Sequence, residues 1–437
     1  MRHKIGIRRE DMYVWERRTP LIPDHVRELC DRHPLDVTVQ SSGRRVFEDD
    51  EYRAVGLPVT DQLADCSVII GLKEIPIDVI ERDKVYVFFS HTIKGQPHNM
   101  AMLKRILDLG ATVIDYERIV DDSGRRLIFF GNYAGLAGMI DTLWTLGQRL
   151  LWEGIPTPLE RVRQASSYAS LAEAKAAIVA VGDEIRTRGL PKSISPLVIG
   201  VTGYGNVSRG AQEILDLLPL TDVSPAALLA GMPAVDPGRP IVKVVFKESD
   251  TVTPQVAGRP FDLQEYYQHP ERYRGTFAQY LPHLHTVVNC IYWEPKYPRL
   301  VTRQDVRDQF EAKRPNLRVI GDISCDVKGA IEVTVRATEP DDPIYVYDPS
   351  RGTTTPGVGG TGPVIMAVEI LPSELPREAS AYFSNILKAF VPQIAAADYS
   401  GPFDACELPL ELKRAVIAYR GSLTPDYRYL EQHLNSA

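Results

Sequence analysis

The chain has 437 residues, of which 44% are hydrophobic, and a formal net charge of −7 at pH 7. This length is enough for about two or three domains that each bury a core of their own. No run of basic residues stands out, so we expect no nucleic acid among its partners. The first residues lack the apolar core of a signal peptide, and no stretch approaches the ~20 apolar residues of a membrane span. We therefore expect a cytoplasmic protein that does not bind membranes.

The five cysteines are widely scattered and form no CxxC pair, which is typical of free thiols in a reducing compartment. They are Cys30, Cys66, Cys290, Cys325 and Cys406. Two carboxylates, Asp322 and Asp326, follow a predicted strand, but no third ligand accompanies them. We therefore expect no bound metal.

Short apolar runs alternate with helical patterns through the first 120 residues, which indicates buried strands of a largely parallel sheet. The predicted strands are Lys4–Ile7, Val37–Val39, Ser67–Ile70, Val85–Phe89 and Ala111–Ile114. The helical patterns between them include Pro23–Arg32 and Pro97–Leu109. A long apolar helix, about Ala134–Trp152, comes next. The small residues at its start would allow close packing against a neighbour. The same sequence pattern is expected for a buried connecting helix and for a helix that crosses between two domains.

A second α/β unit begins with the predicted strand Leu197–Thr202. A helix to about Leu218 follows, and further strands are expected at Ile241–Phe246, Thr286–Asn289 and Leu317–Gly321. The glycine- and threonine-rich segment Gly352–Gly362 is expected to be a loop, with a helix from about Pro363. A last long helix is expected at about Arg377–Ala396.

The strand Leu197–Thr202 runs into Gly203-Tyr204-Gly205 and then a helix, the arrangement that places a pyrophosphate at a helix N-terminus. Ser208 stands where a third glycine is usual, so a glycine turn without a ligand is the alternative. The acidic residue expected about 20 residues further on is unclear, because Asp222 is poorly placed in its strand. Without that carboxylate, NADP is as reasonable as NAD.

Four strands of the first domain each run directly into charged residues, and carboxyl ends of parallel strands share one edge of a sheet. We therefore expect Lys73, His91 and Glu117 around one crevice, although strand ends also become polar simply where they meet water. A lysine and a histidine in a crevice are suited to proton transfer. The adjacent Arg17 and Arg18 could hold a carboxylate, or could be surface arginines ahead of a helix.

The chain resembles the lysine-ketoglutarate reductase domain of α-aminoadipic semialdehyde synthase and, more distantly, saccharopine and alanine dehydrogenases. The resemblance covers nearly the whole chain and rests on these motifs: IRREDMYVWERRTPLIPDHV, GNYAGLAGMIDTL, GLPKSISPLVIGVTGYGNVSRGAQEIL, HPERY, IYWEPKYPRLVTRQD, GDISCDVKGAIE and LPSELPREAS. It implies two Rossmann-like doubly wound domains with an active site in the cleft between them. The substrate and catalytic domain would comprise residues 1–133 and 335–437, and the dinucleotide-binding domain residues 134–334.

The resemblance also implies a reaction, in which lysine condenses with 2-oxoglutarate and NADPH reduces the product to saccharopine; NADH is the alternative cofactor. Lys73 and His91 match the acid–base pair, and Arg18 matches the arginine that holds a substrate carboxylate. Glu16, Glu117 and Asp326 match carboxylates of the site. The phosphate loop matches at Gly203, Tyr204, Gly205, Asn206, Val207 and Ser208.

The bifunctional relatives carry a second half that cleaves saccharopine, and this chain ends at Ala437 without it. We therefore expect only the saccharopine-forming activity, with cleavage by a separate protein. An amino-acid dehydrogenase that uses ammonia, like alanine dehydrogenase, is the first alternative, and a non-catalytic dinucleotide-binding module is the second. The sequence leaves homo-oligomerisation open.

Overall fold

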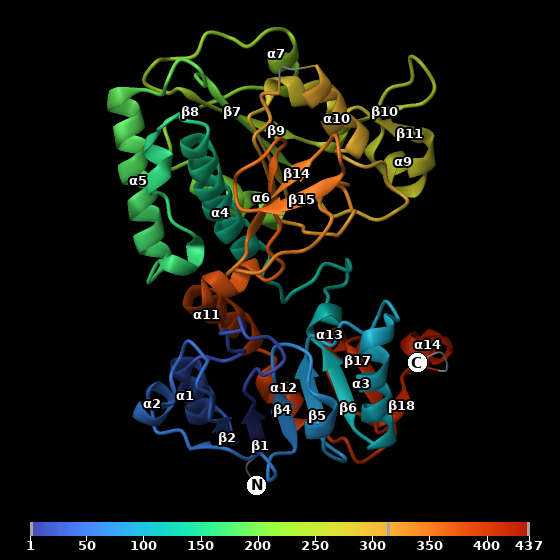
Figure 1. Ribbon diagram of the computed structural model, residues 1–437. Coiled ribbons are helices and arrows are strands. Elements are labelled where there is room, and N and C mark those ends of the chain that lie inside the picture. Colours follow the sequence, from blue (N-terminus) through green and yellow to red (C-terminus); the bar gives the residue numbers. More distant parts are fainter. Residues whose placement is uncertain (1–2, 313–314, 435–437) are drawn as a thin grey trace. The chain divides into compact units, whose positions relative to one another are not determined.

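The computed structural model describes residues 3–312 and 315–434. The chain divides into two compact units. The first unit contains residues 1–130 and 376–437, and the second contains residues 131–375. Figure 1 shows the first unit in blue, cyan and red, because the chain leaves it and later returns, and the second unit in green to orange.

The sheet of the first unit has eight strands in the order β18-β17-β6-β5-β4-β1-β2-β3. The strands from β3 to β6 are parallel, whereas β17 runs antiparallel to β6 and β18 antiparallel to β17. The strands are β1 (His3–Ile7), β2 (Leu35–Gln40), β3 (Val59–Thr60), β4 (Val68–Ile70), β5 (Val85–Phe88), β6 (Thr112–Asp115), β17 (Val416–Tyr419) and β18 (Ser422–Leu423). Successive strands are added on one side of β1 up to β3 and on its other side from β4 onward, which makes the boundary between β1 and β4 the topological switch point of the sheet.

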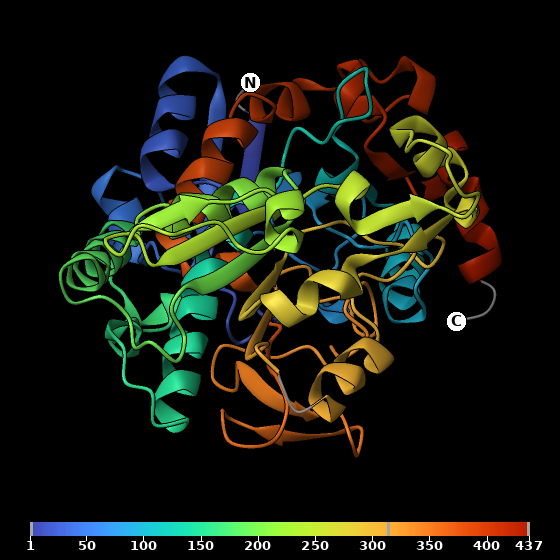
Figure 2. The ribbon, with the colours of Figure 1, turned by 90° about the horizontal axis from the view of Figure 1, so that it is seen from above.

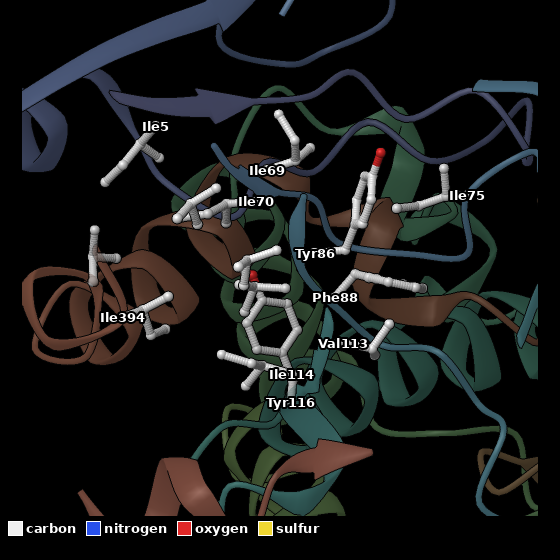
Figure 3. Packing of buried hydrophobic residues seen from close by; sticks show 14 of the residues in the cluster. Ile5, Ile69, Ile70, Ile75, Tyr86, Phe88, Val113, Ile114, Tyr116 and Ile394 are labelled. Carbon is white, nitrogen blue, oxygen red and sulfur yellow. The ribbon is translucent and has the colours of Figure 1, made fainter. Parts of the chain in front are cut away.

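The helices of the first unit are α1 (Pro23–Arg32), α2 (Asp49–Ala54), α3 (Pro97–Asp108), α11 (Pro376–Leu387), α12 (Val391–Ala396), α13 (Leu410–Lys413) and α14 (Glu431–Leu434). Those other than the short α14 contribute buried residues to the core of the unit. In α1, Pro23 occupies the first turn, where no backbone donor is needed, and Val26 and Leu29 are buried. Figure 3 shows Ile394 of α12 with Ile5, Ile70 and Ile114 of the strands in one apolar cluster.

The segment that returns after the second unit is tied closely to the start of the chain. Helix α11 lies alongside α1 in Figures 1 and 2. The Ser384 hydroxyl of α11 accepts a hydrogen bond from the Ile22 backbone N–H and lies 2.8 Å from Nδ1 of His25. Lys388 forms an ion pair with Glu28 at 2.8 Å. The two sequence segments of the first unit therefore form one folded body.

The second unit has another eight-stranded sheet, in the order β15-β14-β16-β13-β12-β7-β9-β8. The strands from β16 to β8 are parallel, and β14 and β15 form an antiparallel edge. They are β7 (Leu197–Thr202), β8 (Leu220–Asp222), β9 (Ile241–Phe246), β12 (Thr286–Asn289), β13 (Val319–Asp322), β14 (Ile344–Asp348), β15 (Thr353–Pro356) and β16 (Val364–Met366). A separate antiparallel pair is formed by β10 (Val252–Pro254) and β11 (Tyr273–Gly275).

Two helices of the second unit, α4 and α6, pack almost backbone to backbone. A Cβ atom at Gly135 of α4 would lie 1.9 Å from the carbonyl oxygen of Val207, and one at Gly210 of α6 would lie 2.1 Å from that of Asn132. The expected close packing of the small-residue start of this helix is thus confirmed. The helices of the unit are α4 (Gly131–Trp152), α5 (Leu171–Arg188), α6 (Asn206–Leu215), α7 (Pro225–Leu229), α8 (Glu248–Thr251), α9 (Leu263–Gln268) and α10 (Arg303–Glu311).

The predicted α/β class with mostly parallel sheets is confirmed, but three local expectations are wrong. The helix expected from about Pro363 is strand β16, whose three residues are all buried between β13 and β14. The expected loop Gly352–Gly362 contains β15, which extends the sheet through backbone pairing with β14. The long helix expected at the end is two helices, since Pro392 lies in the first turn of α12.

The point at which the chain returns to the first unit also differs from the expected one. Residues 335–375 stay with the second unit, because β14 and β16 complete its sheet. The return comes at Pro376 and the departure at Gly131. The functions expected of the two domains stay predictions, as does the cleft between them. None of the helices within the described ranges is long and apolar enough to cross a membrane.

Candidate active site and dinucleotide loop

Ionisable side chains gather at the carboxyl edge of the first unit's sheet, around the switch point between β1 and β4. The Glu10 carboxylate, which follows β1, accepts hydrogen bonds from the backbone N–H groups of Leu72 at 2.8 Å and Lys73 at 2.9 Å, which follow β4. Ligands of open α/β sheets bind outside this edge at such a point. Burial raises the pKa of Glu10 to about 7, against the lowering effect of Arg8.

Glu74 and His91 form a close pair at this edge. Nδ1 of His91, which follows β5, lies 2.5 Å from Oε1 of Glu74, which follows β4. Burial tends to raise the pKa of Glu74, but the hydrogen bond and charge of His91 outweigh it, so the pKa is lowered. Because an ionised carboxylate only accepts, Nδ1 donates the proton, and Nε2 is the nitrogen available for proton exchange.

The backbone of His91 is held in the left-handed region, at φ +49°. Such a conformation costs a histidine about 1–3 kcal/mol and concentrates at functional sites. The Asn99 side-chain amide donates a 3.0 Å hydrogen bond to the His91 carbonyl oxygen and stabilises this turn. The ring of Phe89 stacks against the imidazole, with ring centres 6.0 Å apart. The position of His91 is therefore fixed from the backbone as well as by Glu74.

Glu16 and Arg18 form a buried two-point ion pair in the segment after β1. Arg18 donates from Nε to Oε1 of Glu16 at 2.8 Å and from Nη2 to Oε2 at 2.6 Å, and its backbone N–H donates to Oε1 at 3.0 Å. The guanidinium lies 4.2 Å from the ring centre of Phe130. Arg18 is 3% exposed, whereas Arg17 is exposed. Arg18 is therefore buried within the unit, whereas Arg17 lies on its surface.

Lys73 belongs to the same charged group as these two pairs. Burial would raise the pKa of Glu16, but Arg18 first and Lys73 second keep it lowered by their charges. The Lys73 charge also contributes to the lowered pKa of Glu74. Nζ of Lys73 lies 5.9 Å from the ring centre of Tyr13. The charge of Lys73 therefore lowers the pKa of both Glu16 and Glu74.

Asp115, at the end of β6, organises the next part of the edge. It accepts hydrogen bonds from both the backbone N–H and the hydroxyl of Ser90, and from the backbone N–H of Glu117. Burial raises the pKa of Asp115 to about 6 despite these hydrogen bonds and the charge of His91. The Glu117 carboxylate itself forms an ion pair with Arg126. Glu117 is thus held at the edge, already neutralised by a cation.

The phosphate loop expected in the second unit has the local geometry that a pyrophosphate needs. Gly203 has φ +84°, and a Cβ there would lie 3.1 Å from Ile291, so other residues would be strained. Nothing lies within 4 Å of a Cβ placed on Gly205, which caps α6. The first helical residues, Asn206, Val207 and Ser208, carry N–H groups that have no partner within their own helix. These features fit a dinucleotide.

Asp326, the last predicted site residue, lies in an exposed turn after β13 in the second unit. The turn is anchored by Asp322, which is buried and accepts hydrogen bonds from the Asn289 amide at 2.8 Å and the Thr334 hydroxyl at 2.5 Å. Burial raises the pKa of Asp322 to about 6. No cluster of three or more metal-ligating side chains is found among the residues that the structure describes.

The structure therefore brings Lys73, His91, Glu16 and Arg18 together through shared contacts and charges. Glu117 lies at the same edge, and Asp326 and the phosphate loop lie in the other unit. Sequence reasoning did not select Glu10, Glu74 or Asp115 as site residues. Their signal was present, because each lies within four residues after the end of a predicted strand of that edge.

The fold and these features describe a protein of two α/β units, one with a charged sheet edge and the other with a candidate dinucleotide loop. Residues 6–137 match the family model described as "Alanine dehydrogenase/PNT, N-terminal domain". Alpha-aminoadipic semialdehyde synthase of Arabidopsis thaliana is 41% identical over 98% of this chain and 41% of its own length. The mitochondrial enzyme of that name from Rattus norvegicus is 35% identical over 99% of this chain and 48% of its own.

A relative of similar length is "Saccharopine dehydrogenase [NAD(+), L-lysine-forming]" of Emericella nidulans, 28% identical over 88% of this chain and 90% of its own. Over nearly its whole length, the chain is homologous to the lysine-ketoglutarate reductase region of the synthases and to saccharopine dehydrogenases. It spans a little under half the length of those synthases.

A solved L-alanine dehydrogenase has the same fold, with a TM-score of 0.60 over 99% of both chains at 15% sequence identity. At that identity the likeness concerns the fold alone. The Emericella nidulans enzyme is named for its use of NAD(+).

Proposed function

We propose that this protein is a lysine-ketoglutarate reductase, which condenses L-lysine with 2-oxoglutarate and reduces the product to saccharopine with NADPH. The observation that carries the proposal is the cluster of Lys73, His91–Glu74 and Arg18–Glu16 at one sheet edge. It is supported by the identity of 35–41% to alpha-aminoadipic semialdehyde synthases over nearly the whole chain.

The chemistry needs groups that move protons at two moments. The ε-ammonium of the substrate lysine must lose a proton before its nitrogen attacks the keto carbon, and the hydroxyl of the resulting carbinolamine must gain one before water leaves. Nε2 of His91, oriented by Glu74, and Nζ of Lys73 are the groups that we assign to these transfers. A bound nicotinamide dinucleotide supplies the hydride that reduces the carbon–nitrogen double bond.

Substrates with two carboxylates need cations that hold them in a fixed orientation. Arg18 is our candidate, since Glu16 and Phe130 fix its guanidinium. We assign Glu117 and Asp326 to substrate positioning on the resemblance alone. Gly203, Tyr204, Gly205, Asn206, Val207 and Ser208 would hold the pyrophosphate.

The test measures NADPH oxidation with L-lysine plus 2-oxoglutarate, against pyruvate plus ammonia, each repeated with NADH. We expect turnover with the first pair and saccharopine as the product identified by mass spectrometry. Turnover only with ammonia would replace the proposal by an amino-acid dehydrogenase. Cofactor binding without turnover of any pair would identify a non-catalytic binding module.

The acid–base assignment has its own test. Lys73→Met and His91→Gln should each lower kcat by about 10²–10⁴-fold, the usual contribution of a positioned acid or base. The matched controls are Lys104→Met and His33→Gln, because both side chains are exposed and lie outside the cluster. Near wild-type turnover in Lys73→Met and His91→Gln would refute the assignment.

The cytoplasmic location stays a prediction, for which the name of the rat relative offers the mitochondrion as the alternative.

A further inference from the structure

We propose that Lys247 recognises the 2′-phosphate of the dinucleotide and gives this protein its preference for NADPH over NADH. The inference rests on the proposed function only in requiring that the second unit binds a nicotinamide dinucleotide. It begins from the order of the strands.

The two sheets of this protein differ in one exchange of strands. In the first unit the order β3-β2-β1-β4-β5-β6 follows the usual dinucleotide-binding arrangement, with the second strand next to the first. In the second unit β9, the third strand along the chain, takes that place beside β7, and β8 lies outside it. The side chain that meets the adenosine ribose follows the strand beside the phosphate-loop strand. Here that strand is β9.

The register of β7 and β9 places Lys247 level with the phosphate loop. Thr202, the last residue of β7, pairs with Phe246, the last residue of β9. The backbone N–H of Gly203 donates a 2.9 Å hydrogen bond to the Phe246 carbonyl oxygen. Lys247 is the next residue, is exposed, and has its Nζ 5.9 Å from the ring centre of Tyr204 in the loop.

The neighbouring carboxylate, which would favour an unphosphorylated ribose, already has partners. Oε1 of Glu248 accepts a hydrogen bond from the Tyr267 hydroxyl at 2.8 Å and one from the Tyr204 hydroxyl at 3.5 Å. An acidic residue selects NAD by binding both ribose hydroxyls, whereas a cation selects the 2′-phosphate. Lys247 places an exposed positive charge beside Tyr204 of the loop, so the arrangement favours NADPH.

Asp222, the carboxylate closest to the expected sequence spacing, is in the wrong place for this role. It ends β8, one strand too far from β7, and its Oδ1 lies 3.1 Å from Nζ of Lys243. The same ammonium forms an ion pair with Asp216 at 2.6 Å. Asp222 therefore neutralises a lysine within the sheet.

The experiment measures binding to the full chain by isothermal titration calorimetry, with adenosine 2′,5′-bisphosphate and 5′-AMP as probes. The wild-type protein should bind the bisphosphate more tightly. Lys247→Ala should weaken its binding about 10- to 100-fold, the value of one charge-assisted hydrogen bond, and change 5′-AMP binding by less than about twofold. Lys192→Ala is the matched control, since that exposed lysine precedes β7 at the opposite edge of the sheet.

Two results would overturn the inference: no preference of the wild-type protein for the bisphosphate, or a preference that Lys247→Ala leaves intact. Asp222→Ala tests the competing residue, and a lost preference there would also contradict the proposal. Because these measurements use no amino acid or keto acid, their outcome is independent of turnover. A protein that binds the bisphosphate through Lys247 but does not turn over lysine with 2-oxoglutarate would refute the proposed function alone.

Discussion

Nδ1 of His91 and Oε1 of Glu74 lie 2.5 Å apart, and the second oxygen of Glu74 is buried without a hydrogen-bond partner. The imidazole is the side-chain hydrogen-bond partner of this carboxylate, and the backbone N–H of Glu74 and the charge of Lys73 also lower its pKa.

Glu74→Gln should lower kcat by about tenfold or more with a smaller effect on the KM values. The amide keeps the size of the side chain but removes the charge that favours a protonated imidazole during proton transfer. Initial rates at saturating substrate check this, with circular dichroism as the measure of folding. A loss of folded protein with an unchanged kcat in the surviving fraction would mean that Glu74 is only structural.

Arg18→Met and Glu16→Gln should each destabilise the protein by about 3–5 kcal/mol, because removal of one partner leaves a buried group uncompensated. The double variant should lose less than the sum of the two. Urea denaturation of the four proteins gives the coupling. Arg27→Met is the control, since its ion pair with Asp31 is about half exposed, and it should cost below ~1 kcal/mol. Additive losses in the cycle would contradict a coupled pair.

The pH dependence of stability should reveal a buried carboxyl pair in the second unit, Asp141 and Glu374. Asp141 accepts from the Ala165 N–H at 2.7 Å and Glu374 from the Ser166 N–H at 3.2 Å, and the two buried carboxyl groups also share a side-chain hydrogen bond with each other. Burial, and then the charge of Asp141, raises the pKa of Glu374 well above its ordinary value, and burial raises that of Asp141 to about 6. The pair therefore retains a proton when folded.

A pKa raised in the folded state stabilises the protein below the unfolded pKa, and this contribution is lost as pH rises through the folded pKa. The free energy of unfolding should thus fall from about pH 5 towards alkaline pH, and Glu374→Gln should flatten that fall. Urea denaturation at several pH values measures both curves. Glu369→Gln, at an exposed position nearby, should leave the wild-type slope unchanged. Equal slopes in wild type and Glu374→Gln would rule out the shared proton.

Gly210→Ala should weaken dinucleotide binding as well as stability. Its new methyl group would meet the Asn132 carbonyl oxygen at 2.1 Å, and backbone cannot move aside as a flexible side chain can, so α6 and the loop before it must shift. Titration with adenosine 5′-diphosphate and thermal unfolding report the two effects. Gly43→Ala is the control, because nothing lies within 4 Å of a Cβ there. Unchanged binding would show that the loop is independent of the α4–α6 contact.

Much of the fold could be predicted from the sequence, because buried parallel strands are continuous apolar runs; α1, β7, β9 and β12 have the predicted bounds. The structure of the segment after Pro363 could not be predicted, since a short apolar run preceded by proline is compatible with a helix start or a buried strand. The site residues that were missed, such as Glu10 and Glu74, are identified by contacts between segments distant in sequence. The order of β8 and β9 in the sheet depends on tertiary packing, so it could not be predicted from the spacing of residues along the chain.

The discontinuous first unit has a consequence for the order in which the protein can fold during synthesis. The second unit is one continuous stretch, residues 131–375, so its chain is complete while the first unit still lacks β17. That strand pairs with β6 and has no substitute until residues 416–419 emerge. The edge of β6 therefore stays unpaired while the whole second unit is translated, and unpaired strand edges promote aggregation. Newly made chains of this protein should depend on chaperones mainly through their first 130 residues.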